Sequence, residues 1–218
     1  MRNVAVIGMG HVGATVAFTL FTHGIVDNLY LLDKNQAKAE AEYNDLRDTL
    51  ARNDYHVNVF LGDYSDLKDV DIIVTSFGNI AATVKTGDRF GEFEINSKNA
   101  KEVGDKIRES GFKGILINIS NPCDAISTIL QETTGLSKKQ VFGTGTFLDT
   151  ARMQRIVGEA LNEDPRNVAG FVLGEHGASQ FTAWSTVSVN GKSAKELFTK
   201  EQEEKLSAQP NKNSMKVA

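Results

Sequence analysis

The chain has 218 residues, 40% of them hydrophobic and 24% charged, with only 3 prolines, a composition typical of a globular protein that buries a sizeable core. A formal net charge of -4, without any Lys/Arg-rich run, argues against nucleic acid as a partner. The single cysteine excludes an intramolecular disulfide, and no segment approaches the ~18 consecutive apolar residues of a transmembrane helix, so we expect a cytoplasmic protein without membrane contact.

Short apolar runs alternate with longer segments of helical period along most of the chain. This alternation predicts a parallel sheet with crossover helices. The predicted strands cover residues 4–7, 29–32, 57–61, 71–75, 115–119 and 140–142. The predicted helices cover residues 11–23, 35–52 and 94–110, a segment from Pro122 to about 134, and residues 149–161.

The pattern changes after Asn167. The runs FVLG and FTAWSTVSVN carry the β-branched and aromatic residues of antiparallel strands, and a charged helix is expected over residues 194–206. The final stretch, SAQPNKNSMKVA, has no hydrophobic period. Because the strands after Asn167 would lack partners that bury their second face, we expect disorder between Gly191 and Ala218. We place a domain boundary at about residue 145, which divides the chain into residues 1–145 and 146–218.

The motif GMGHVG follows the first predicted strand and opens the first helix, with Gly8, Gly10 and Gly13 in G-x-G-x-x-G spacing. Glycines at such a turn can serve packing alone, but here the backbone N–H groups and the helix N-terminus can face a pyrophosphate. Asp33 ends the second strand at the position where a carboxylate accepts from both ribose hydroxyls and repels a 2′-phosphate. The sequence therefore predicts a Rossmann doubly wound domain that binds NAD rather than NADP.

Two further segments follow predicted strands. GNIAATVKTGDRF, residues 78–90, has no clear period, and its Arg89 is either a solvated loop arginine or a group that swings onto a carbonyl oxygen when the loop closes. SNPCD, residues 120–124, lies where open α/β sheets bind ligands, and Asn121 offers both a donor and an acceptor there. We interpret Cys123 as a packing residue and expect no metal site.

Asp149 and Arg152 lie three residues apart in LDTARMQR, which places them on one helix face. They can form a simple intrahelical ion pair. Alternatively, Arg152 clamps a substrate carboxylate while Asp149 orients an imidazole. The candidate imidazole is His176 in GEHG, which taken alone reads as an ordinary loop histidine.

Taken in order, GMGHVG, Asp33, GDRF, SNP, LDTARMQR and GEHG resemble the L-lactate and malate dehydrogenase family. The resemblance covers the chain to about Gly191. Within the family, the segments SFGNI, TGDRF, ISNP and GEHGASQFTAWSTV are most similar to L-2-hydroxyisocaproate dehydrogenases.

The resemblance implies that His176 accepts and donates the proton, with Asp149 behind it. It implies that Arg89 polarises the substrate carbonyl, that Arg152 clamps the carboxylate, and that Asn121 binds near the reacting oxygen and the nicotinamide. It further implies a homo-oligomer acting on a small 2-oxo or 2-hydroxy acid. Since the family continues beyond this point, we expect residues 146–218 to be an incomplete α+β substrate domain.

Other functions remain to be weighed. L-lactate and malate dehydrogenase are alternatives within the family, but the small or apolar residues at positions 80–84 favour an aliphatic side chain larger than methyl. A metal-dependent NAD glycosidase lacks its best ligand, because Ser120 precedes Asn121 where a cysteine would be needed. A non-catalytic NAD-binding protein would not need both Asp149 and His176.

Overall fold

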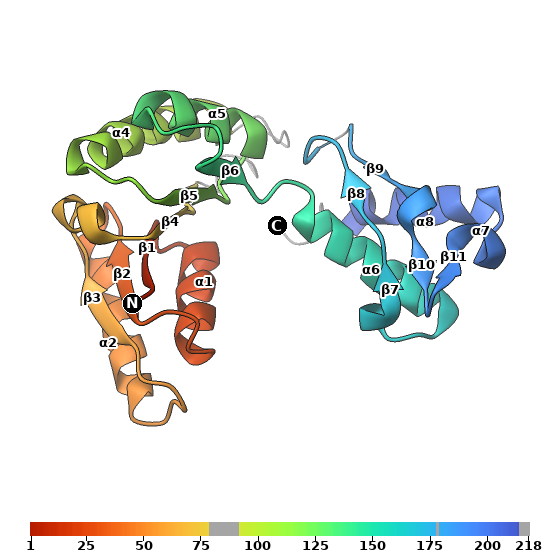
Figure 1. Ribbon diagram of the computed structural model, residues 1–218, viewed down its shortest axis with the longest axis horizontal. Helices are drawn as coiled ribbons and strands as arrows, with labels where there is room; N and C mark the ends of the chain where they lie inside the picture. Colours follow the sequence, from red (N-terminus) through yellow and green to blue (C-terminus); the bar gives the residue numbers. More distant parts are fainter. Residues whose placement is uncertain (79–91, 178, 214–218) are drawn as a thin grey trace. The chain divides into compact units, whose positions relative to one another are not determined.

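A computed structural model describes residues 1–78, 92–177 and 179–213 of the chain, which folds into two units, Met1–Gly143 and Thr144–Ala218. The first unit is built on a six-stranded parallel sheet with strand order β3-β2-β1-β4-β5-β6 (Figure 1). Its strands are β1 (Asn3–Ile7), β2 (Asn28–Leu32), β3 (Asn58–Leu61), β4 (Ile72–Thr75), β5 (Ile115–Asn118) and β6 (Val141–Gly143). The predicted α/β fold with a doubly wound sheet is confirmed.

Four long helices cover the two faces of this sheet (Figure 1). They are α1 (His11–Thr22), α2 (Gln36–Leu50), α4 (Phe93–Ser110) and α5 (Cys123–Thr134), with a short 3-10 helix η1 (Tyr64–Asp69) before β4. Apolar residues of α1 and α2 pack with one set of strand residues, and those of α4 and α5 with the other set. The central strands are apolar without alternation because both of their faces are buried.

The second unit is organised around α6 (Phe147–Leu161). Its strands form a three-stranded sheet and a two-stranded hairpin: β7 (Val168–Ala169), β10 (Ser188–Val189) and β11 (Lys192–Ser193), and β8 (Val172–Leu173) with β9 (Phe181–Thr182). Met153 and Val157 on α6 are buried against Val168, Val187 and Val189, which gives this unit a core of its own.

The end of the chain differs from the prediction. The single helix expected over residues 194–206 is two helices, α7 (Ala194–Leu197) and α8 (Lys200–Asn213). Phe198 has an extended backbone, and Thr199 restarts the helix in a capping-box arrangement in which its N–H donates to Gln202 Oε1 at 2.8 Å. The prediction of disorder between Gly191 and Ala218 is also wrong as far as Asn213, because β11, α7 and α8 lie in this part of the chain.

Short polar segments were the other feature that the sequence did not predict. Asp63 caps η1 in a reciprocal arrangement with Asp66, and this polar pattern has no hydrophobic period by which it could be recognised.

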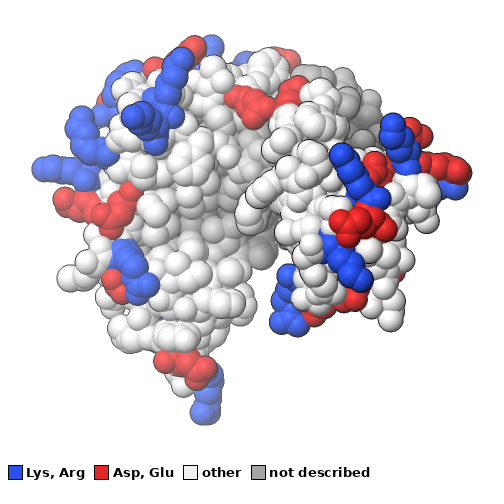
Figure 2. Space-filling model, turned by 45° about the vertical axis from the view of Figure 1, so that its right-hand side comes forward, with Lys and Arg blue, Asp and Glu red and all other residues white. Residues whose placement is uncertain are grey.

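On the face drawn in Figure 2, the charged side chains of the described residues lie in mixed groups, without a large area of one sign. None of the helices described is long and apolar enough to cross a membrane.

The stability of the first unit should depend on the middle of the sheet. Leu116 on β5 is fully buried, whereas Leu61 on the edge strand β3 is 36% exposed. We expect Leu116→Ala to lower the free energy of unfolding by about 2–5 kcal/mol through lost burial and a residual cavity. The matched control Leu61→Ala should cost about 1 kcal/mol or less. Urea unfolding followed by circular dichroism measures both, and equal losses would contradict this description of the core.

Candidate active site

The glycine motif forms the tight turn between β1 and α1. Gly8 has φ +101°, and a Cβ there would lie 2.9 Å from the backbone N of Phe77, so that both its conformation and its surroundings require glycine. Gly13 packs against Gly8 O and Ser76 Oγ. Among the described residues, apart from the chain neighbours of Gly10, no atom lies within 4 Å of the place that a Cβ of Gly10 would occupy. This open space in front of the N-terminus of α1 fits a pyrophosphate group.

Asp33 lies directly after β2 and contacts the glycine turn. Its Oδ2 accepts from the backbone N–H of Met9 at 2.6 Å, and its Oδ1 accepts from that of Asn35 at 2.8 Å. A carboxylate has about four acceptor positions, so two remain for ribose hydroxyls.

Burial raises the pKa of the nearby Tyr64 to about 12, with the negative charges of Glu102 and Asp33 contributing. Tyr64 is therefore a neutral phenol at neutral pH.

Asn121 follows β5 and is exposed. Its backbone carbonyl accepts from Nδ2 of Asn96 on α4 at 2.7 Å, a contact that the sequence did not predict. Among the described residues, Asn96 Oδ1 and Ser120 Oγ are buried without a hydrogen-bond partner. Buried polar atoms are normally paired, so these two oxygens fit the approach of a polar ligand. The glycine turn, Asp33 and these oxygens together fit a dinucleotide such as NAD.

The second unit brings His176 and Asp149 together across 27 positions of the sequence. Nδ1 of His176 lies 2.5 Å from Oδ2 of Asp149, and Nη1 of Arg152 lies 3.1 Å from Oδ1 of the same carboxylate. The Asp149 side chain is only 2% exposed, against 17% for His176 and 27% for Arg152. Both contacts weighed from the sequence are thus present at once: the intrahelical ion pair and the carboxylate–imidazole pair.

This arrangement has a defined chemical capacity. When the Asp149 carboxylate accepts from the Nδ1–H of His176, the Nε2 of that ring is left to exchange a proton with a bound molecule. Arg152 uses one of its five N–H donors on Asp149, so its guanidinium can still bind a carboxylate with others. A base and a cation therefore stand beside each other in the second unit.

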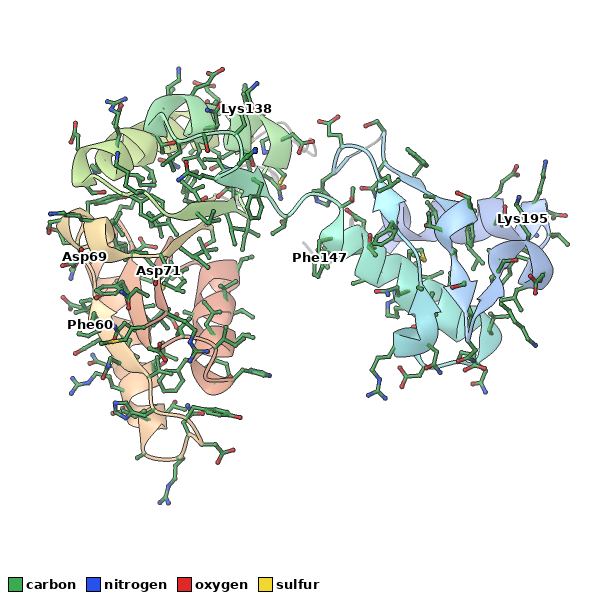
Figure 3. The ribbon with its side chains drawn as sticks, viewed as in Figure 1. Phe60, Asp69, Asp71, Lys138, Phe147 and Lys195 are labelled. Atoms are coloured by element: carbon green, nitrogen blue, oxygen red, sulfur yellow. The ribbon has the colours of Figure 1, made fainter. Side chains whose placement is uncertain are left out.

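Two threonines hold the start of the segment that leads to His176: Thr146, the residue before α6, and Thr150, within α6. Thr146 Oγ1 donates to the carbonyl of Val172 at 2.7 Å, and Thr150 Oγ1 accepts from the N–H of the same residue at 3.0 Å. Gly174, with φ +99°, then turns the chain toward His176 in the loop between β8 and β9. In Figure 3, the labelled Phe147 marks the N-terminal end of α6 that carries these anchors. These anchors could not be predicted from the sequence, because threonines at a helix start are common caps.

Some of the predicted residues cannot be compared with the structure. Arg89 and the segment 80–85, on which the substrate prediction depends, lie outside the described residues. Cys123 is buried, in keeping with its interpretation as a packing residue. In the part of the chain that is described, no group of three or more His, Cys, Asp or Glu side chains could hold a metal ion.

The fold and these side chains define a class: a doubly wound nucleotide-binding unit joined to a unit that carries a carboxylate–histidine pair. Residues 2–143 match the family model of the lactate/malate dehydrogenase NAD binding domain, and residues 146–212 match that of the lactate/malate dehydrogenase alpha/beta C-terminal domain. The chain belongs to the lactate/malate dehydrogenase family, and NAD is the cofactor of its first unit.

Named relatives give the same assignment. The chain is 46% identical over 191 residues to L-lactate dehydrogenase 1 of Bifidobacterium longum, covering 88% of this chain and 60% of that protein. It superposes with TM-score 0.91 and 33% identity on MGS-M5, a lactate dehydrogenase from a Medee basin deep-sea metagenome library, covering all of this chain and 71% of the other. It also superposes on the ligand-bound minor L-lactate dehydrogenase of Enterococcus mundtii, with TM-score 0.90 and 31% identity. This superposition covers 99% of this chain and 70% of the other. The chain thus spans about 60% of the length of the Bifidobacterium longum enzyme that it matches.

The contact between Asp149 and His176 can be tested without any turnover. We expect Asp149→Asn to shift the imidazole from the Nδ1–H tautomer toward Nε2–H, because an amide can donate to Nδ1 where a carboxylate can only accept. Nitrogen-15 NMR of the side chain, assigned among the four histidines by comparison with His176→Asn, measures this. An unchanged tautomer would contradict the orienting role of Asp149.

Proposed function

We propose that the protein is an NAD-dependent L-2-hydroxy-acid dehydrogenase, which interconverts 2-hydroxy and 2-oxo acids. The observation that carries the proposal is the pairing of His176 Nδ1 with the buried carboxylate of Asp149. A binding protein without catalysis has no need of an oriented base. Family membership and the geometry of the glycine turn support the cofactor half of the proposal.

NAD supplies the hydride acceptor for oxidation and, as NADH, the hydride donor for reduction. In the direction of reduction, C2 of the 2-oxo acid would receive this hydride and His176 Nε2 would give a proton to the carbonyl oxygen, so that charge and atoms balance. The buried Asp149 stabilises the imidazolium before this transfer. In oxidation, His176 takes the hydroxyl proton back. One residue serves both directions because an imidazole nitrogen can both accept and donate a proton.

The other side chains position the substrate in this proposal. Arg152 binds the substrate carboxylate with the N–H groups that Asp149 does not use, and the planar fork of a guanidinium matches a carboxylate in a bidentate way. Asn121 hydrogen-bonds near the reacting oxygen and the nicotinamide. Arg89 polarises the carbonyl. The enzyme would act as a homo-oligomer, as the resemblance implies.

For the side chain of the substrate, we propose an aliphatic group larger than methyl. The sequence between Ile80 and Val84 is small or apolar, and an ionised second carboxylate enters a dry pocket only when a cation pairs with it. Lys85 is the only Lys or Arg between Ile80 and Arg89, so it is the residue that could pair with a second carboxylate. The alternative of L-lactate is favoured by the names of the relatives, which are L-lactate dehydrogenases.

A panel of 2-oxo acids with NADH tests this proposal. We expect 2-oxoisocaproate to have a higher specificity constant than pyruvate, by roughly fourfold for each methylene that the pocket accepts, and oxaloacetate to be a poor substrate.

His176→Asn should abolish turnover and leave NADH binding intact, whereas the exposed control His56→Asn should behave as the parent.

The outcomes of the panel separate the alternatives. Pyruvate as the best substrate would replace the proposal by L-lactate dehydrogenase, and oxaloacetate as the best would replace it by malate dehydrogenase. NADH binding without turnover of any 2-oxo acid would indicate a non-catalytic NAD-binding protein.

The choice of NAD over NADP depends on Asp33. We expect Asp33→Ala to weaken NADH binding by ~1.5–3 kcal/mol for each charged hydrogen bond lost, and to allow some use of NADPH. Part of the loss would come from the glycine turn, because Met9 also loses its acceptor. Fluorescence titration with both cofactors measures the effect, with the exposed Asp48→Ala as the control. Equal use of NADPH and NADH by the parent protein would contradict the assignment.

A further inference from the structure

β4 lies between β1 and β5, so its end faces both ligand-binding loops of the first unit. The residues at this end are Thr75, the last of the strand, and Ser76, the next in the chain. Neither was a candidate from the sequence. Ligands of open α/β sheets bind at the carboxyl ends of such strands, which makes the polar contacts of this pair important for the geometry of the site.

Ser76 is tied to the glycine turn. Its backbone N–H donates to the carbonyl of Ile7 at 2.9 Å, which extends the pairing of β4 with β1 by one residue. Its hydroxyl donates to the carbonyl of Gly8 at 2.7 Å. An apolar side chain at position 76 would keep the backbone bond to Ile7 but remove the side-chain bond that links the end of β4 to the carbonyl of Gly8.

Thr75 is tied to the loop of Asn121 through a buried asparagine. Thr75 and Asn118 are direct partners on β4 and β5, and both are fully buried. The hydroxyl of Thr75 donates to Asn118 Oδ1 at 3.1 Å. The same Oδ1 accepts from the N–H of Ser120 at 3.0 Å, and Nδ2 of Asn118 donates to the carbonyls of Ser120 and Cys123 at 3.0 and 3.1 Å.

A fully buried amide in a strand is costly unless its hydrogen bonds are made. The backbone N–H of Ser120 can only donate, so it makes Oδ1 the acceptor end of the Asn118 amide, and the hydroxyl of Thr75 donates to the same oxygen from β4. The donor end is thereby directed to the carbonyls that flank Asn121, on Ser120 and Cys123, while the Thr75 bond holds the amide against β4. A plain apolar pair at these two positions would fill the sheet equally well, so the polar pair serves the loop rather than the core.

We propose that Thr75 and Ser76 are positioning residues that set the two ligand loops of the first unit independently. Ser76 sets the glycine turn and hence the affinity for the cofactor. Thr75, acting through Asn118, sets Asn121 and hence the hydride-transfer geometry. The second half of this inference rests on the proposed dehydrogenase function.

Two variants of the full chain test the inference. Thr75→Val keeps the shape of the side chain and removes the donor, and Thr75→Ser restores the donor. We expect Thr75→Val to lower kcat by roughly 3- to 10-fold, the effect of one lost hydrogen bond, with the Kd for NADH nearly unchanged, and Thr75→Ser to recover kcat. Ser76→Ala should instead raise the Kd for NADH by a similar factor. Thr128→Val, an exposed threonine on α5, is the matched control.

A second measurement needs no turnover. In the protein bound to NADH, the side-chain amide resonances of Asn121 should move in Thr75→Val, return in Thr75→Ser, and stay in place in Ser76→Ala. Equal effects of Thr75→Val and Ser76→Ala on both loops, or parent-like amide resonances in Thr75→Val, would overturn the inference. Absence of turnover in the parent protein together with the expected resonance shifts would instead overturn only the proposed function.

Discussion

The buried carboxylate of Asp149 is the constraint on which the second unit depends. An ionised carboxylate with a side chain 2% exposed is tolerated only with partners at hydrogen-bond distance. His176 and Arg152 are those partners, one from the loop between β8 and β9 and the other from the same helix. Because removal of either leaves a charge poorly compensated, the loop must stay folded against α6. The demands of stability and of the proposed proton transfer therefore coincide in one group.

In the first unit, the corresponding constraint is the convergence of strand ends. β1, β2, β4 and β5 are parallel neighbours, so the chain leaves them at a common edge. The glycine turn, Asp33 and Asn121 all follow these ends. Hydrogen bonds then adjust the loops to one another: Asp33 holds the N–H of Met9, and Asn96 holds the carbonyl of Asn121. Hydrogen bonds between side chains and the backbone of these loops thus determine where the proposed ligand-binding groups lie.

The sheet of the first unit and its crossover helices could be predicted from the sequence because the apolar runs and the glycines mark every change of direction. Asp33 could be proposed from its distance to the glycine motif, and Asp149 with Arg152 from their three-residue spacing, whereas the roles of Asn121 and His176 came from the resemblance to the family. Other features depend on contacts between distant residues, which no local pattern records. The partnership of Thr75 and Asn118 requires the strand register, and the anchoring of Val172 by Thr146 and Thr150 requires the folded hairpin. The break between α7 and α8 at Phe198 was not predicted, because a charged helical period continues across it.

In the proposed reaction, a hydride from NADH reaches C2 of a 2-oxo acid while His176 supplies the proton to oxygen. The most direct measurement is the fate of deuterium when NADH carrying it at C4 is incubated with the protein and 2-oxoisocaproate or pyruvate in ordinary water. The account predicts an L-2-hydroxy acid that carries deuterium at C2 when one face of C4 is labelled and none when the other face is labelled. A product with solvent hydrogen at C2 from both labelled cofactors, or no 2-hydroxy acid at all, would contradict it.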